Sequence, residues 1–226
     1  FKQKTAYEIM PSLVGSEMCI RDRFLIPRPT TVAAACRNQR AGVERHVGPI
    51  RSTHHRLAVV GPLFDDLARA PSVGRMGEVI LLLRRPDGRL LLHTKSFYPP
   101  GTYRLPSGGI RPGESVMDAA RREAAEETGL TVREVRPLDR LTYTLRQGRR
   151  RLFFHSWRVL VDVEGEPVMD DAEERIAGFR WIEPEELDGV AAHLRSLPGD
   201  WAGWGRFRAM AHSDVRLTPP PSCGII

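Results

Sequence analysis

One short segment, residues 115–129, restricts the possible folds of this chain more than any other. Ser115 and Asp118 form a capping-box pattern, which predicts a helix start, and Gly129 provides the left-handed residue that ends a helix. Successive residues of a helix are about 100° apart around its axis, so six residues of this segment fall on one side of the helix and form a stripe. The stripe consists of Val116, Ala119, Ala120, Glu123, Glu126 and Glu127. Such a stripe normally faces a core, yet its second half here carries carboxylates.

The carboxylates of this stripe predict a metal site. Like charges three or four residues apart repel, and burying them without a counter-charge is costly. A solvated acidic face is the alternative, but Glu123, Glu126 and Glu127 share the stripe with the apolar residues. Mg²⁺, with Mn²⁺ as a substitute, prefers oxygen ligands and would neutralise them. The preceding glycine-rich loop, residues 107–114, lets the backbone approach a phosphate or a metal closely, so phosphate chemistry is indicated.

The segments around this helix predict a mixed α/β sandwich in a single domain. Apolar runs at 78–83 and 89–94, joined by Asp87-Gly88, are typical of buried strands with a tight turn. Residues 138–146 and 151–163 predict a long hairpin, and 178–182 predict a short strand. Pro184 is expected to open a second helix. We therefore expect the domain to span residues 74–212, followed by a flexible tail at 213–226.

Residues 1–73 differ in composition from the rest of the chain. The chain has three lysines against 31 arginines, and two of the lysines are Lys2 and Lys4. Residues 1–23 are interpreted as a translated sequencing adapter, because "MCIRDR" back-translates to a transposon end sequence, and targeting signals do not fit it. Residues 24–73 are basic and are expected to be disordered or spurious. The alternative, a basic arm for nucleic acid, is disfavoured, since the arginine-rich and proline-rich composition suits a tail.

Composition excludes several classes of protein. The cysteines, Cys19, Cys36 and Cys223, form neither a disulfide framework nor a metal spacing. No apolar run approaches the 18 or so residues of a membrane span. Residues 76–226 contain 22 basic and 22 acidic residues, so the net charge of +6 arises at the front. We expect a cytoplasmic protein that does not bind a membrane, and the composition disfavours a nucleic-acid partner.

The spacing of residues 108–130 resembles the Nudix box. Its matching positions are Gly108, Glu114, Arg122, Glu123, Glu126, Glu127 and Gly129. Two departures are small, since Ala124 replaces a larger aliphatic residue and Arg111 stands where an acid is common. The resemblance covers residues 74–200 and implies an α/β/α sandwich with a mixed sheet.

What the resemblance implies is hydrolysis of the pyrophosphate linkage in a nucleoside diphosphate joined to another group. Glu126 and Glu127 would be the chief metal ligands, Glu123 a third ligand or a base, and the Gly108 carbonyl a further ligand. Arg122 would pair with Glu126 and orient it. Nucleotide sugars, dinucleotides, nucleoside triphosphates and capped RNA all stay open as substrates. A non-catalytic nucleotide-sensing regulator on the same fold is the alternative, and a homodimer is compatible with either.

Several further residues are candidates around this site. Arg104, Lys95, Gly109 and Glu114 are candidates for contacting substrate, or, for Glu114, for holding the loop. The acidic segment that follows the hairpin offers candidate general bases. They are Asp170, Asp171, Glu173 and Glu174.

Overall fold

The sheet at the centre of the protein has seven strands. The computed structural model describes residues 50–59, 62–70, 77–169 and 175–217. The strands are β1 (Arg51–Ala58), β2 (Glu78–Arg84), β3 (Leu90–Lys95), β4 (Ser107–Gly109), β5 (Thr131–Gln147), β6 (Arg150–Glu164) and β7 (Ile176–Ile182). Their order is β1-β5-β6-β2-β3-β7, and β4 pairs with β2. β1 with β5 and β2 with β6 are parallel pairs, and the other named pairs are antiparallel, so the sheet is mixed as expected.

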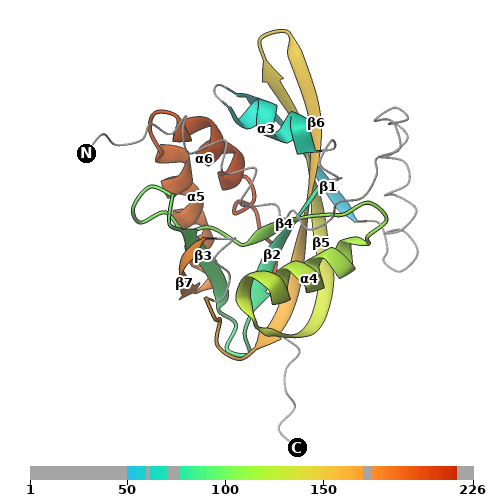
Figure 1. Ribbon diagram of the computed structural model, residues 1–226, viewed down its shortest axis with the longest axis vertical. Helices are drawn as coiled ribbons and strands as arrows, with labels where there is room; N and C mark the ends of the chain where they lie inside the picture. Colours follow the sequence, from blue (N-terminus) through green and yellow to red (C-terminus); the bar gives the residue numbers. More distant parts are fainter. Residues whose placement is uncertain (1–49, 60–61, 71–76, 170–174, 218–226) are drawn as a thin grey trace, which may run out of the picture.

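Helices cover both faces of this sheet (Figure 1). On one face lies α4 (Val116–Thr128), and its small residues pack against alternate residues of β2 and β6 in one apolar core. On the other face, a second core includes α3 (Leu63–Arg69), α5 (Leu187–Ser196) and α6 (Trp201–Ala209), with the short 3-10 turn η2 (Pro184–Glu186) before α5. The α/β/α sandwich is therefore confirmed.

Strand β2 lies at the middle of the fold because both of its faces are apolar. All seven of its residues are buried. It pairs with β3 only next to the turn, at Arg84 and Leu90. Beyond that point the two strands diverge, and the segment leading to β4 enters between them, with Arg104 bridging to His93 of β3. This arrangement brings the glycine-rich loop to the α4 face.

The long hairpin β5–β6 was predicted, but it starts earlier than expected. β5 begins at Thr131, two residues after Gly129, which ends α4. Register shifts near Val132 and Pro137 exchange the faces of its side chains along the way. Val135 thus faces the α4 core, whereas Leu141 and Tyr143 face the α5 core.

Four elements were not expected from the sequence. β1 and α3 lie before residue 74, the short β4 lies in the predicted glycine-rich loop, and α6 follows α5. β1 pairs in parallel with β5 along its whole length, and α3 buries Leu63, Phe64 and Leu67. These parts of the 24–73 segment differ from the expected disorder because tertiary contacts with β5 and β6 hold them. Residues 213–217 likewise lie against the fold, since the Ser213 carbonyl accepts a hydrogen bond from Arg158 at 2.6 Å. The remaining domain limits stay predictions.

No helix within the described part of the chain has the length and apolar character needed to cross a membrane.

Candidate active site

Helix α4 begins and ends where the sequence predicts. The Ser115 hydroxyl accepts a hydrogen bond from the Asp118 N–H at 3.1 Å and donates one to the Asp118 carboxylate at 2.6 Å. Gly129 has a φ of 66°, the left-handed conformation that ends the helix. Residues next to each end of α4 thus determine where the helix begins and ends. The sequence therefore determines that the three carboxylates lie on one side of the helix.

The glycine loop lies directly against one of these carboxylates. Gly108 is buried, and a Cβ atom placed on it would lie 1.9 Å from the Glu123 Cδ. Only a residue without a side chain leaves space for the Glu123 carboxylate at this point. The loop and the acidic half of the helix stripe are therefore in contact, as the metal-site prediction requires.

Arg122 connects the carboxylates with the loop. Its guanidinium donates to both Glu114 carboxylate oxygens, at 2.7 and 2.9 Å, and to the Gly109 carbonyl at 2.8 Å. The same side chain donates to Glu123 at 2.7 Å and to Glu126 at 3.0 Å. The expected i,i+4 pair with Glu126 is thus present. Glu114 also accepts from the Arg111 N–H at 2.9 Å, so its contacts hold the loop.

The contacts of Arg122 shift the pKa values of the groups that take part in them. Burial alone would lower the pKa of Arg122, but its hydrogen bonds to Glu114 and the neighbouring carboxylates raise it. Burial opposes ionisation of Glu114, yet the bonds from Arg122 and the Arg111 N–H outweigh it and lower the pKa of that carboxyl. Nη2 of Arg111 lies 3.6 Å from Oε1 of Glu126, so the two side chains form an ion pair. The helix and its loop thus present four carboxylates, Glu114, Glu123, Glu126 and Glu127, whose oxygens are the ligands that a hard divalent cation prefers.

Glu127 faces the sheet rather than solvent. Its side chain is 3% exposed, and its Oε2 lies 3.7 Å from Nδ1 of His93 on β3. Burial, followed by the charges of Arg104, Lys95 and Arg208, lowers the pKa of His93 well below its ordinary value, so the imidazole is neutral. The sequence did not identify His93 as part of this site, because a single histidine in an apolar strand gives no functional signal.

The carboxylates do not form a closed metal cage in this structure. Within the described ranges, no group of three or more His, Cys, Asp or Glu side chains is placed to share one ion. Glu123 and Glu126 contact Arg122, while Glu127 lies toward β3. The donor chemistry nevertheless fits Mg²⁺, since the helix stripe supplies carboxylate oxygens and the loop backbone reaches them at Gly108.

The two basic residues expected to contact substrate are buried. Arg104 is 1% exposed and donates to the Tyr98 hydroxyl, the Leu105 carbonyl and the Ser107 hydroxyl at 2.8 to 2.9 Å. Lys95 is 2% exposed. These contacts support a structural role for Arg104 and offer no support for phosphate binding. The candidate bases Asp170, Asp171, Glu173 and Glu174 lie outside the described residues.

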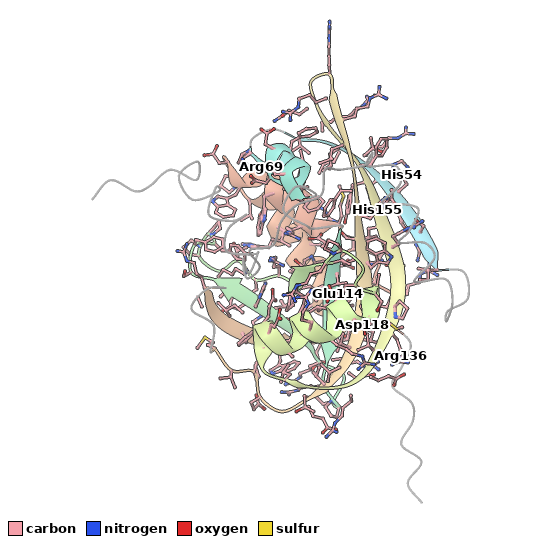
Figure 2. All side chains as sticks on the ribbon, turned by 45° about the vertical axis from the view of Figure 1, so that its right-hand side comes forward. His54, Arg69, Glu114, Asp118, Arg136 and His155 are labelled. Atoms are coloured by element: carbon pink, nitrogen blue, oxygen red, sulfur yellow. The ribbon has the colours of Figure 1, made fainter. Side chains whose placement is uncertain are left out.

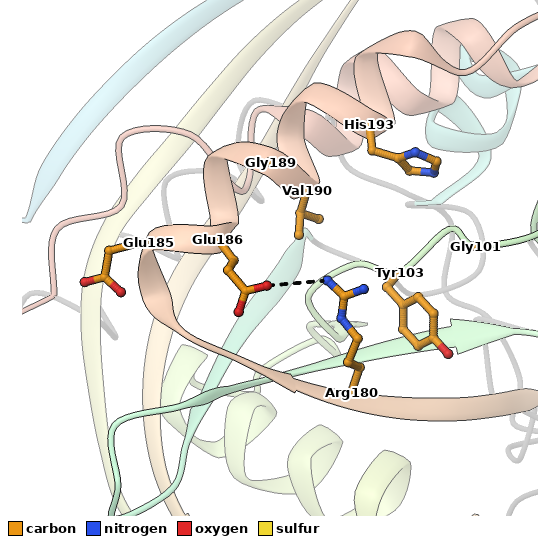
Figure 3. Close-up of a pocket in the computed structure, with 8 residues that line it drawn as sticks. All are labelled: Gly101, Tyr103, Arg180, Glu185, Glu186, Gly189, Val190 and His193. Carbon is orange, nitrogen blue, oxygen red and sulfur yellow. Dashed lines mark ion pairs between the residues drawn. The ribbon is translucent and has the colours of Figure 1, made fainter.

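A cavity of about 460 Å³ lies on the other side of the sheet, beside α5 (Figure 3). Its lining includes Tyr103, Arg180 and His193. Arg180 lies over the Tyr103 ring at 5.5 Å and 3.9 Å from Glu186, and Thr102 hydrogen-bonds His193 at 3.2 Å. None of the predicted metal ligands lines this cavity.

Comparison with curated proteins finds relatives that match this part of the chain. The RNA pyrophosphohydrolase of Caulobacter vibrioides (strain NA1000 / CB15N) is 43% identical over 70 residues, covering 30% of this chain and 36% of the relative. The NAD-capped RNA hydrolase NUDT12 of Macaca fascicularis is 45% identical over 58 residues, covering 25% and 13%. The nucleoside triphosphatase NudI of Escherichia coli O1:K1 / APEC is 32% identical over 94 residues, covering 39% and 66%. In each case the chain covers less than two thirds of the relative.

Solved structures are similar at low identity. The MutT protein of Bacillus halodurans shows 22% identity and a TM-score of 0.42, covering 50% of this chain and 71% of that one.

A family model, described as the NUDIX domain, matches residues 74–200 of the chain. This match covers more than half of the sequence and contains the whole α4 site with its glycine loop. The chain therefore belongs to the Nudix family.

Proposed function

We propose that this protein hydrolyses the pyrophosphate linkage of a nucleoside diphosphate joined to another group, using Mg²⁺ or Mn²⁺. The observation that carries the proposal is the contact between the glycine loop and the acidic half of α4, at Gly108 and Glu123. Glu123, Glu126 and Glu127, with the Gly108 carbonyl, are the groups that would hold the metal. Bound there, Mg²⁺ would neutralise phosphate oxygens and make a water molecule more acidic.

The protein's own residues would position these groups. Arg122 contacts two of the proposed ligands and the Gly109 carbonyl, so one side chain sets the spacing of helix and loop. Glu114 holds the loop through Arg122 and the Arg111 N–H. The proton of the attacking water would pass to a carboxylate, either Glu123 or one of Asp170, Asp171, Glu173 and Glu174.

The alternative, a nucleotide-sensing regulator without catalysis, needs no metal-assisted water. Arg122, Glu123, Glu126 and Glu127 are all present, and the Arg122 contacts orient two of them, which favours the enzyme. The relatives are named for different substrates, as an RNA pyrophosphohydrolase, an NAD-capped RNA hydrolase and a nucleoside triphosphatase. Because these substrates differ, we propose the linkage and leave the attached group open. Cytoplasmic location and a homodimer remain predictions.

The test is a product-mass screen over nucleoside diphosphate derivatives, with Mg²⁺, with Mn²⁺ and with chelator. Glu126→Gln keeps the size of the side chain but removes its charge, so we expect at least a roughly 100-fold loss of turnover. Glu166→Gln, an exposed glutamate outside the site, is the matched control and should keep the wild-type rate.

Metal binding is measured separately, by Mn²⁺ electron paramagnetic resonance on the same variants. Glu126→Gln should weaken Mn²⁺ binding, whereas Glu166→Gln should not. An unchanged rate in Glu126→Gln, or no turnover of any compound with either metal, would refute the proposal.

A further inference from the structure

The part of the sheet beyond α4 carries an open surface rich in arginine. Strands β1, β5 and β6 pair residue by residue, so side chains that face the same way form rows across the three strands. One face of these rows is formed by Ser52, His54, Arg56, Arg140, Thr142, Thr144, Arg146, Arg151, Phe153 and His155. We call this surface the arginine face.

The arginine face lies on the same side of the sheet as α4. Trp157 is buried in the α4 core and pairs with Arg140 on β5. From Trp157 toward the hairpin tip, every second residue of β6 faces the same way: His155, Phe153 and Arg151. Each step of two residues along β6 moves about 6.6 Å farther from Trp157. The arginine face therefore begins next to the part of the sheet that α4 covers. Figure 2 shows His54 and His155 on this part of the sheet, away from Glu114 at the start of α4.

The charge of this surface is uniformly positive. It has four arginines and no carboxylate, and none of the four forms an ion pair with a carboxylate of the described residues. Arg146 and Arg151 lie directly opposite each other on β5 and β6. Like charges in directly opposite positions destabilise a sheet. This pair therefore costs stability without a compensating partner there, which indicates an anionic ligand.

An aromatic ring lies among these arginines. Phe153 is 65% exposed and stands in one row with Thr144 and Arg56. A single exposed Phe is ordinary, but a ring between guanidiniums on an open sheet face is suited to stacking an unpaired base. Two imidazoles lie beside it, with His54 hydrogen-bonded to Thr144 at 2.8 Å and His155 to Thr142 at 3.2 Å.

We propose that the arginine face binds single-stranded RNA. The arginines would contact phosphates, and Phe153 would stack on a base. The threonine hydroxyls and imidazoles between them can exchange hydrogen bonds with ribose 2′-hydroxyls. A duplex is a poorer fit because its bases are stacked on one another and cannot reach Phe153. The binding requires no hydrolysis, so it goes beyond the proposed function and stands independently of it.

The test uses the full chain and an RNA of about 12 nucleotides with a 5′-hydroxyl, labelled at its 3′ end, in chelator. Fluorescence anisotropy measures the Kd between about 50 and 200 mM salt. With four phosphate contacts, log K should fall against log salt with a slope of about −3. In Arg146→Gln/Arg151→Gln the Kd should rise at least about tenfold, and the slope should become shallower by about 1.4.

The matched control is Arg206→Gln/Arg216→Gln, which removes the same charge from exposed positions in and after α6. Its RNA affinity should stay near wild type. Thermal unfolding separates binding from folding, since the loss of the opposed pair should leave the melting temperature of Arg146→Gln/Arg151→Gln unchanged or raise it. A structural role for these arginines would lower that temperature instead.

Phe153→Ala tests the aromatic contribution. We expect about a tenfold weaker affinity with an unchanged salt slope, because stacking is not ionic. Single-stranded DNA of the same sequence and duplex RNA should both bind more weakly than the single-stranded RNA. Equal affinity of wild type and Arg146→Gln/Arg151→Gln would overturn the proposal. So would an equal loss in the control variant, equal binding of the duplex or the DNA, or binding to anionic lipid vesicles without binding to RNA.

Discussion

At the scale of single residues, the candidate site depends on one arginine and one missing side chain. Arg122 donates to three carboxylates and to a loop carbonyl; burial alone would lower its pKa, but the hydrogen bonds to these carboxylates raise it. Gly108 provides the space that the Glu123 carboxylate occupies. A lysine at position 122 could not reproduce this set, since it offers a single point charge in place of a planar group with five donors.

Replacing Gly108 with alanine should therefore damage the site more than the fold. The new Cβ would lie 2.2 Å from Glu123 Oε2, so the carboxylate must move away from its position beside Arg122. We expect turnover to fall about 10- to 100-fold, with little change in melting temperature because only a side-chain end shifts. Gly189→Ala, whose Cβ would meet nothing within 4 Å, is the control. A wild-type rate in Gly108→Ala would show that this position of Glu123 is not required.

At the scale of elements, α4 was predicted with its bounds, whereas β1 and α3 were not predicted. The signals for α4 are local, namely a cap at Ser115, a 3.6-residue period and Gly129. β1 alternates exposed and half-buried residues, several of them His or Arg, and its parallel pairing with β5 joins segments 88 residues apart. The residues next to β1 in the sequence cannot predict a pairing with a strand so far along the chain.

Deleting residues 1–73 should lower stability if these elements belong to the folded domain. The deletion removes β1 from the edge of β5 and takes Leu63, Phe64 and Leu67 out of the core. A milder change, Phe64→Ala, should cost about 3–5 kcal/mol of unfolding free energy in urea titrations. Deletion of residues 1–49 alone keeps β1 and α3 and serves as the control. Equal melting temperatures for the full chain and the 1–73 deletion would contradict this packing.

At the scale of the whole molecule, buried polar groups join the C-terminal segment to the sheet. Arg208 of α6 donates to Glu78 of β2 at 2.9 Å. His212 accepts from the Leu105 N–H at 2.9 Å, and its other ring nitrogen bonds the Arg208 carbonyl at 2.9 Å. Both ring nitrogens are thus used in the neutral form, and protonation would break the bond from Leu105. These contacts connect α6 with the segment that leads into the glycine loop.

This arrangement predicts acid sensitivity. Burial lowers the pKa of His212 to about 3, below the value of about 6.5 expected in the unfolded chain. The unfolded state therefore binds more protons below pH 6.5, so the contribution of His212 to stability is complete above that pH. It is lost as pH falls toward 3, by up to about 1.4 kcal/mol per pH unit.

Urea unfolding between about pH 7 and pH 5 checks this prediction. As the pH decreases, the free energy of unfolding of the wild type should fall more steeply than that of His212→Asn, because the variant lacks the titrating group. His193→Asn, at an exposed position of α5, is the matched control, because it replaces a histidine without touching the contacts of His212 with Leu105 and Arg208. Identical steepness in wild type and His212→Asn would exclude a role for His212 in the acid sensitivity.

The sequence alone determined the helix that carries the carboxylates, the apolar strands beside it, the hairpin and the family. These features depend on period, caps and short spacings, and such signals act between residues a few positions apart. Only the tertiary structure decided that Glu123 lies against Gly108, that Glu127 lies beside His93, and that Arg104 and Lys95 are buried. It also decided that arginines from β1, β5 and β6 share one open face. Each of these contacts joins residues that are distant along the chain, and their meeting depends on strand order and register rather than on local preference.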